Sequence, residues 1–161
     1  MNNIYLIGMP GCGKSTIAKI LSDKLGMEYI DADIYLEDKF NKKIRDIFAL
    51  EGEDVFRNME TQVISELTQK NNIIVSTGGG VVTRNRNKLP MKSSGKVVFI
   101  DSDPEFILKN STLGGRPLLK DKSRIFDLYK TRIDLYRDFA DVTAKNNSSI
   151  EDAVHAIINL L

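Results

Sequence analysis

The segment GMPGCGKST (Gly8 to Thr16) constrains the fold of this chain more than any other stretch of its sequence. It follows the apolar run from Ile4 to Ile7 and precedes a helical pattern in which Ile17, Leu21 and Leu25 recur at i, i+4 and i+8. The segment fits the pattern GxxxxGKS, whose glycines allow backbone N–H groups to turn inward around a phosphate. The sequence therefore predicts a strand, a phosphate-binding loop and a helix, in that order.

The residue types in this loop suit the phosphates of a nucleotide. Lys14 is expected to reach the β- and γ-phosphate oxygens, and Ser15 offers a hydroxyl to Mg²⁺. Cys12 is interpreted as a small residue that fits a tight turn, and the alternative is a reactive thiol beside Lys14. The whole loop is expected to contact the nucleotide, through Gly11, Cys12, Gly13, Lys14, Ser15 and Thr16.

The composition fits one ordinary domain without a nucleic-acid or membrane partner. The chain has 161 residues, and its 23 lysines and arginines nearly balance its 22 aspartates and glutamates. No apolar stretch approaches the roughly 20 residues that span a bilayer, and no signal-peptide pattern precedes the loop. A single cysteine excludes an internal disulfide. These features together predict a cytoplasmic location.

Short apolar runs alternate with helical patterns along the chain. The runs are NIYLI, MEYIDAD, NIIVST, KVVFID and ADVTAK. Strands that alternate with helices are joined by right-handed crossovers, which make the strands parallel and cover both faces of their sheet. The predicted fold class is therefore α/β, with three layers and a five-stranded parallel sheet flanked by helices.

The segment EDVFRNMETQVISELTQ (53–69) has an amphipathic helical pattern. Arg57 and Glu60 are spaced i, i+3 and are therefore expected to be neighbours on the polar face, where an exposed ion pair is the commonest explanation. The apolar stripe of this helix consists of Val55, Phe56, Met59, Val63 and Leu67.

Three further segments carry weaker signals. The last helix is expected to begin with Ser148 and Glu151 in capping-box spacing. The same helix is expected to bury Ile150, Val154, Ile157, Ile158 and Leu161.

Two other segments lie between the predicted elements. Residues 85–96 are predicted to form a polar, exposed connection, and residues 111–123 are a candidate mobile lid.

Two acidic residues follow the second predicted strand in the sequence DAD. Asp31 and Asp33 are two positions apart, so their carboxylates would point the same way in an extended chain. The carboxyl edge of a parallel sheet is where ligands bind. One carboxylate is therefore expected to hold a metal-bound water while the other orients or deprotonates an attacking hydroxyl. The alternative is that one of them caps the next helix.

Three consecutive glycines, Gly78 to Gly80, follow the third predicted strand. A strand that ends in glycines brings its backbone close to a neighbour or a ligand, because no side chain stands in the way. The pattern therefore indicates a small ligand bound by backbone N–H groups at this point.

These motifs, in their order and spacing, resemble the shikimate kinase family over nearly the whole chain. They are GMPGCGKST, DAD, DIFALEGEDVFRNME, STGGG, RPLL and RIDLY. The resemblance implies ATP-dependent phosphorylation of the 3-hydroxyl of shikimate, a step of aromatic amino-acid biosynthesis, with Mg²⁺, by a monomer of the nucleoside-monophosphate-kinase-like P-loop kinase fold. It implies one domain over residues 1–161, with a core of 1–32, 71–110 and 139–161, a substrate-binding segment near 33–60 and a lid near 111–123.

The resemblance also assigns the side chains that contact the acceptor. Asp33 matches the aspartate that contacts the reacting hydroxyl. Arg57 and Arg132 match two arginines that clasp the substrate carboxylate, for which planar, bidentate donors are well suited. Glu60 is expected to orient Arg57.

Further roles follow from the same resemblance. Gly79 matches a backbone contact to the substrate, with Gly78 and Gly80 shaping the turn. Arg116, in RPLL, matches a lid arginine over the transferring phosphate, and Lys109 lies where the family often has an arginine that stacks on adenine. The implied catalytic residues are Asp33, Lys14 and Arg116, and the implied metal-binding residues are Ser15 and Asp31.

Three departures from the family pattern affect mainly the adenine contacts. Lys109 replaces arginine, Asp134 in DLY replaces proline, and the stretch AKNNSS lacks an arginine that some members use. Two other functions remain alternatives. One is another small-molecule kinase of this architecture, acting on gluconate or a nucleoside monophosphate, and the other is a non-catalytic, nucleotide-dependent regulatory module.

Overall fold

The five expected strands form one parallel sheet in the order β2-β3-β1-β4-β5. The structure is a computed structural model, and it describes residues 2–110 and 122–161. The predicted fold class is confirmed. The strands are β1 (Asn3–Ile7), β2 (Glu28–Asp31), β3 (Ile73–Ser76), β4 (Gly95–Asp101) and β5 (Val142–Lys145).

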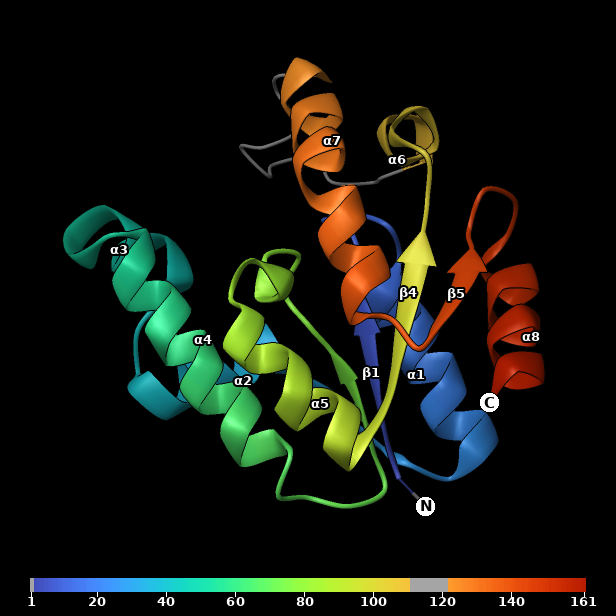
Figure 1. The fold of residues 1–161 in the computed structure, drawn as a ribbon, viewed down its shortest axis with the longest axis horizontal. Coiled ribbons are helices and arrows are strands. Elements are labelled where there is room, and N and C mark those ends of the chain that lie inside the picture. Colours follow the sequence, from blue (N-terminus) through green and yellow to red (C-terminus); the bar gives the residue numbers. More distant parts are fainter. Residues whose placement is uncertain (1, 111–121) are drawn as a thin grey trace.

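Helices cover both faces of this sheet (Figure 1). Helices α5 and α7 pack on β4 in front of the strands, while α1 lies behind them and packs against α8. Helices α2, α3 and α4 pack together beside the sheet. The helices are α1 (Lys14–Leu25), α2 (Ala32–Phe40), α3 (Ile44–Glu51), α4 (Glu53–Leu67), α5 (Lys88–Ser94), α6 (Pro104–Asn110), α7 (Lys122–Phe139) and α8 (Ile150–Leu160), with short 3₁₀ turns at Val81–Thr83 and Asn85–Asn87.

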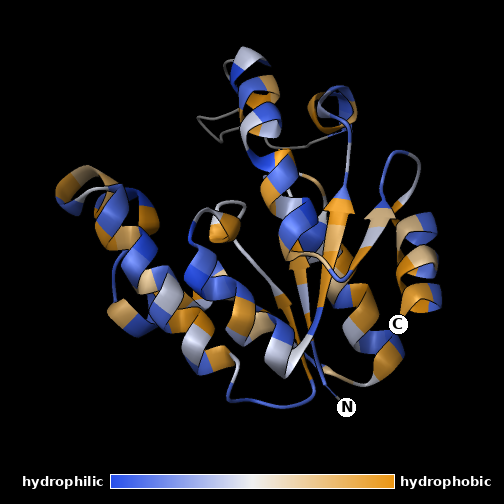
Figure 2. Cartoon of the chain, in the orientation of Figure 1, coloured by the Kyte–Doolittle hydropathy of each residue, from blue (hydrophilic) through white to orange (hydrophobic). Residues whose placement is uncertain are grey.

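The central strands supply the core. Every residue of β1 and β3 is buried, and so are the last five residues of β4. Figure 2 shows the corresponding apolar colour along these strands, with polar residues on the outer surfaces of the helices. Strands that are covered on both faces need side chains that are apolar on both sides, which explains why the sequence shows continuous apolar runs.

The strand order determines where a ligand can bind. The chain runs from β1 to β2 and β3 on one side, and then crosses β1 to reach β4 on the other side. The loops that follow β1 and β3 therefore diverge at the carboxyl edge of the sheet, where open α/β sheets hold ligands. The phosphate loop and the triple-glycine segment are these two loops.

Residues 85–96 are not the exposed connection that their polarity predicts. They form a 3₁₀ turn, helix α5 and the start of β4, and they bury Asn87 and Met91. The Asn87 side chain donates to the carbonyl of Val81 over 2.9 Å. Met91 is the one buried residue of this seven-residue helix, which has no clear apolar stripe, and ion pairs of Lys88 and Lys92 with Asp138 and Asp141 also hold it.

The start of α8 differs from the prediction by one residue. Ser149, and not Ser148, caps the helix by accepting from the N–H of Asp152 over 3.1 Å, while Ser148 donates to the Asp152 carboxylate. Leu161 is 43% exposed and Ala153 is buried, so the apolar stripe is also shifted toward the start of the helix. Adjacent serines offer two possible caps, and packing of the helix selects one.

The candidate lid lies almost entirely outside the described residues. Its last two positions, Lys122 and Ser123, belong to the first turn of α7. Arg116 falls in the part that is not described. Among the described helices, none is long and apolar enough to cross a membrane.

Asn3 connects β1 to the start of β3, and its loss is expected to destabilise the fold. Its side chain accepts from the N–H of Ile73 over 3.2 Å and donates to the carbonyl of Lys70 over 2.8 Å. Asn3→Ala leaves both backbone groups without these partners, so the free energy of unfolding in urea should fall by about 2–3 kcal/mol. Asn2→Ala, at the exposed neighbour, is the matched control and should change it by less than about 0.5 kcal/mol. Equal effects would contradict this account.

Candidate active site

The phosphate loop is preformed around the amino group of Lys14. Nζ of Lys14 donates to the carbonyls of Gly8 and Met9 over 2.8 and 2.9 Å, and the residue is only 7% exposed. Gly13 caps α1 with a backbone φ of 95°, a conformation that residues other than glycine rarely adopt. Cys12 is buried with its sulfur 3.7 Å from Lys14 Nζ, which agrees with a small residue in a tight turn.

Asn146, which sequence reasoning missed, holds this loop from the far side of the sheet. It follows β5, is buried, and donates from Nδ2 to the carbonyl of Cys12 over 2.8 Å. Its own N–H donates to the carbonyl of Asp101 at the end of β4. The sequence offered only a weak signal, because AKNNSS reads as an ordinary polar loop.

Asp31 and Asp33 do not lie in one extended strand, so the predicted geometry of this pair is wrong. Asp31 ends β2 and caps α2, and its Oδ1 accepts from the N–H groups of Asp33 and Ile34 over 2.9 and 3.1 Å. Asp33 lies in the first turn of α2. A capping aspartate already turns the chain into a helix at this position, which ends the alternation of a strand.

The second oxygen of Asp31 faces the phosphate loop. The Ser15 hydroxyl lies 3.4 Å from Asp31 Oδ2 and 3.1 Å from the hydroxyl of Ser76, which ends β3. The described residues contain no cluster of three or more histidine, cysteine or acidic side chains that could enclose a metal. One hydroxyl and one nearby carboxylate fit Mg²⁺, which takes most of its ligands from phosphate and water.

The triple-glycine segment lies between four side chains that approach it closely. A methyl group at Gly78 would lie 2.9 Å from Asp33 Oδ1 and 3.0 Å from Glu60 Oε2, and a methyl group at Gly80 would overlap the guanidinium of Arg57. At Gly79 it would lie 2.8 Å from the ring of Pro10 in the phosphate loop. A side chain at any of these positions would displace one of these groups. The segment therefore brings Asp33, Glu60 and Arg57 together.

Arg57 and Glu60 form a buried ion pair, so the expectation of an exposed pair on a polar face is wrong. They are 5% and 3% exposed, and Arg57 Nη1 donates to Glu60 Oε1 over 2.8 Å. Glu53 contributes a second carboxylate 3.5 Å from Arg57 Nε. Helix α4 is covered on this side by the triple-glycine segment, which a helical pattern alone does not reveal.

The Glu60 carboxyl is strongly perturbed. Its pKa is raised to about 7, mainly by burial, and the nearby carboxylate of Asp33 adds to this rise. The charges of Arg57 and Arg132 act in the opposite direction. Its second oxygen, Oε2, is buried without a hydrogen-bond partner among the described residues. The groups that act on this carboxyl come from α2, α4 and α7, so they lie around one point.

Helix α7 supplies the remaining acceptor residue of the sequence prediction. Arg132 is half-buried and close enough to affect Glu60, and Tyr136, one turn later, donates to the carbonyl of Gly79 over 2.6 Å. Lys109 is exposed in the last turn of α6. The predicted acceptor residues Asp33, Arg57, Gly78, Gly79, Gly80 and Arg132 are therefore brought together next to the phosphate loop.

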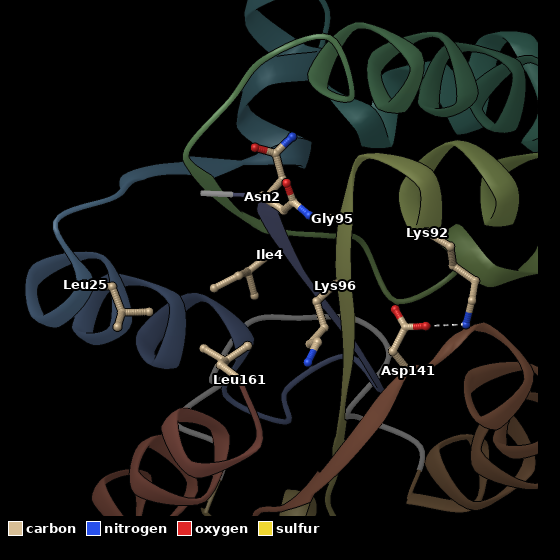
Figure 3. Close-up of a pocket in the computed structure, with 9 residues that line it drawn as sticks. Asn2, Ile4, Leu25, Lys92, Gly95, Lys96, Asp141 and Leu161 are labelled. Carbon is tan, nitrogen blue, oxygen red and sulfur yellow. Dashed lines mark ion pairs between the residues drawn. The ribbon is translucent and has the colours of Figure 1, made fainter.

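The cavity in Figure 3 lies at the other end of the sheet from this site. It has a volume of about 560 Å³ and is lined by the first residues of β1 and β4, Asn3 and Gly95, and by Leu161. Lys92 and Asp141 at its rim already form an ion pair of 2.6 Å. Its position at the amino ends of the strands separates it from the phosphate loop.

Comparison with known proteins gives consistent similarities. The model of the family described as shikimate kinase matches residues 10–161. A shikimate kinase from Clostridium botulinum (strain Eklund 17B / Type B) is 42% identical over 161 residues, covering 99% of this chain and 97% of that protein. A shikimate kinase from Acinetobacter baumannii, solved in complex with shikimate, has a TM-score of 0.92 at 36% identity and covers 99% of this chain and 92% of its own.

A more distant similarity shows the fold alone. A gluconokinase from Sinorhizobium meliloti has a TM-score of 0.64 at 13% identity, covering 99% of this chain and 93% of that one. By contrast, a shikimate kinase from Aquifex aeolicus has a TM-score of 0.85 at 35% identity, covering 98% of this chain and 94% of its own, so its similarity extends to the sequence. The similarities in sequence therefore favour one acceptor class among proteins that share this architecture.

The pKa of Glu60 predicts a particular dependence of stability on pH. The folded chain holds the Glu60 proton up to about pH 7, whereas the unfolded chain releases it near the ordinary value of 4.5, so stability from this group falls as pH rises between these values. Glu60→Gln removes the titration. The stability of the variant relative to wild type, measured by urea unfolding, should therefore rise from about pH 5 to about pH 8.

Glu66→Gln is the control for this measurement. The hydrogen bond from Lys39 lowers the pKa of Glu66, so this carboxyl stays ionised in both states over the same range. Its relative stability should not depend on pH there. A flat difference for Glu60→Gln as well would show that Glu60 is ionised throughout.

Proposed function

The chain belongs to the shikimate kinase family, and from this premise we propose how its residues carry out the ATP-dependent phosphorylation of shikimate. The observation that carries the proposal is the contact between Gly79 and Pro10, which joins the predicted acceptor residues to the phosphate loop. Donor and acceptor groups are thereby held at one edge of the sheet. The reaction transfers the γ-phosphoryl group of ATP to the 3-hydroxyl of shikimate.

The phosphate loop binds the triphosphate of ATP. Backbone N–H groups from Gly11 to Thr16 and the amino end of α1 favour the negative charge, and Lys14 exchanges its two carbonyl contacts for phosphate oxygens. Ser15 and Asp31 would hold Mg²⁺, since the serine hydroxyl lies 3.4 Å from Oδ2 of the aspartate. When bound, Mg²⁺ neutralises charge on the phosphate oxygens.

Two arginines bind the carboxylate of the acceptor. Arg57 is buried and held by Glu60, so its guanidinium is already oriented and desolvated before substrate arrives. Arg132 reaches the same region from α7. A carboxylate between two guanidinium groups makes charge-assisted, bidentate contacts, which a nucleoside monophosphate without a carboxylate cannot make.

Asp33 orients the reacting hydroxyl and takes its proton. Its carboxylate lies beside Gly78 at the start of α2, close to both the acceptor residues and the phosphate loop. The hydroxyl oxygen forms a bond to the γ-phosphorus as the bond to the leaving oxygen of ADP breaks, and the proton passes to Asp33. A loose transition state needs this base mainly for positioning.

The remaining roles concern charge and water. Lys14 and Arg116 neutralise charge on the transferring group, and closure of the segment near 111–123 excludes water that would otherwise accept the phosphoryl group. Lys109 lies near the adenine. We also propose that the protein acts as a cytoplasmic monomer with no nucleic-acid or membrane partner, divided into core, substrate-binding segment and lid as the sequence predicts.

An acceptor comparison tests the proposed function. ADP release should depend on shikimate in the presence of ATP and Mg²⁺, and gluconate, AMP and CMP should give no release above the rate without acceptor. The two guanidinium groups and the glycine segment favour a compact, carboxylate-bearing polyol. Release with AMP or CMP, which carry no carboxylate, would overturn the carboxylate clamp, and release with gluconate alone would keep the clamp but change the acceptor. ATP binding without any release would favour the regulatory alternative.

Two substitutions should separate the chemical step from acceptor binding. Asp33→Asn should lower kcat by about 100-fold or more with little change in the KM for ATP, because the proton acceptor is lost. Arg57→Ala should chiefly raise the KM for shikimate, by more than about tenfold, because one charged contact is lost. Initial rates of ADP release measure both values.

Exposed residues of the same types provide the controls. Asp38→Asn lies on α2 and Arg45→Ala on α3, and both should leave kcat and KM unchanged. Near-normal turnover of Asp33→Asn would remove Asp33 from the mechanism. An unchanged KM for shikimate in Arg57→Ala would do the same for the carboxylate clamp.

A further inference from the structure

Tyr136 connects the triple-glycine segment to helix α7. The residue is fully buried, and its hydroxyl donates to the carbonyl of Gly79 over 2.6 Å. It follows Arg132 by four positions, so the two side chains lie on one face of the helix. The mechanism described above uses Arg132 and Gly79 but assigns no role to the tyrosine between them.

The other two carbonyls of this segment are bonded locally. Gly78 accepts from the N–H of Val81 over 3.2 Å, and Gly80 accepts from the N–H and hydroxyl of Thr83 over 3.0 and 2.6 Å. Only the carbonyl of Gly79 is held by a side chain from a distant element. Because a peptide group is planar, fixing this carbonyl also fixes the orientation of the peptide between Gly79 and Gly80.

The tyrosine ring is itself held in place. It stacks on Phe99 of β4 with the ring centres 5.1 Å apart and an angle of 19° between the planes. Burial raises the pKa of the Tyr136 hydroxyl well above its ordinary value, although the charge of Arg132 acts in the opposite direction. The hydroxyl therefore keeps its proton and remains a donor to Gly79 at every pH at which the protein is folded.

We propose that Tyr136 is a positioning residue that fixes the Gly79 segment relative to Arg132, so that the backbone and the guanidinium meet the acceptor in a single preset geometry. The opposite side of Gly79 packs on Pro10, so the segment is held between the phosphate loop and α7. This inference rests on the proposed function, because it takes Gly79 and Arg132 as acceptor contacts. It assigns Tyr136 to shikimate binding and not to ATP binding or to the chemical step.

Tyr136→Phe tests this proposal, because it keeps the ring and removes only the hydroxyl. We expect the KM for shikimate to rise about tenfold, while kcat and the KM for ATP stay within about twofold, since one oriented hydrogen bond is lost from the acceptor side alone. Initial rates of ADP release, with each substrate varied in turn at saturation of the other, give the three constants.

Tyr5→Phe is the matched control. Tyr5 is equally buried, and its hydroxyl bonds to Ser94 over 2.7 Å near the amino end of β4, away from the site. Tyr5→Phe loses the hydrogen bond with Ser94 and a second one from Asn3 Nδ2 over 3.2 Å, so urea unfolding should show a loss of stability at least as large as that of Tyr136→Phe. Only Tyr136→Phe should change the KM for shikimate. An equal rise in both variants would show that general loosening of the fold is responsible and would overturn the proposal.

A double-substitution cycle with Arg132→Lys gives an independent measurement. If Tyr136 and Arg132 act on the acceptor as one unit, the combined rise in the KM for shikimate should be smaller than the product of the two single effects. Wild type without shikimate-dependent turnover would refute the proposed function itself. Active wild type, with an unchanged KM in Tyr136→Phe or with fully multiplicative effects in the cycle, would refute only the role of Tyr136.

Discussion

A buried arginine must be compensated, and the acceptor half of this site is arranged around that requirement. Arg57 lies within α4 at 5% exposure, so its charge is balanced by the Glu60 carboxyl at 2.8 Å, which ionises near pH 7, and by Glu53 further out. A partly compensated guanidinium attracts an anion more strongly than a surface arginine does, because water no longer screens it. The same burial perturbs Glu60, so in the proposed mechanism one pair links substrate affinity to the stability of the fold.

The glycine segment is the point at which this pair meets the nucleotide side. Side chains from α2, α4 and α7 and the ring of Pro10 all approach the backbone after β3 to distances that exclude a Cβ atom or form a hydrogen bond. No single element could place an acidic group, an arginine and a phosphate loop so close together. The absence of side chains at three consecutive positions allows four elements to meet there.

The parts of this arrangement that could be predicted from sequence are those that depend on local pattern. The phosphate loop, the five strands and the helix after the loop follow from glycine spacing and apolar runs, and the structure has them. Burial of Arg57 and Glu60 could not be read in the same way, because it depends on which segment covers α4. Asp33 was misplaced for a local reason, since its neighbour Asp31 caps α2 and ends the strand. The contact of Tyr136 with Gly79 leaves no signal in the sequence, because the two residues lie 57 positions apart.

The choice of acceptor is therefore a property of contacts between elements and not of the sheet. A gluconokinase keeps this architecture at 13% identity, which shows that the same strands can serve another acceptor. In this chain the proposed acceptor residues lie around the triple-glycine segment, where α4 supplies a buried guanidinium and α7 a second arginine. In the proposed mechanism the sheet and the phosphate loop hold the donor, and the helices packed against the glycine segment present the hydroxyl to it.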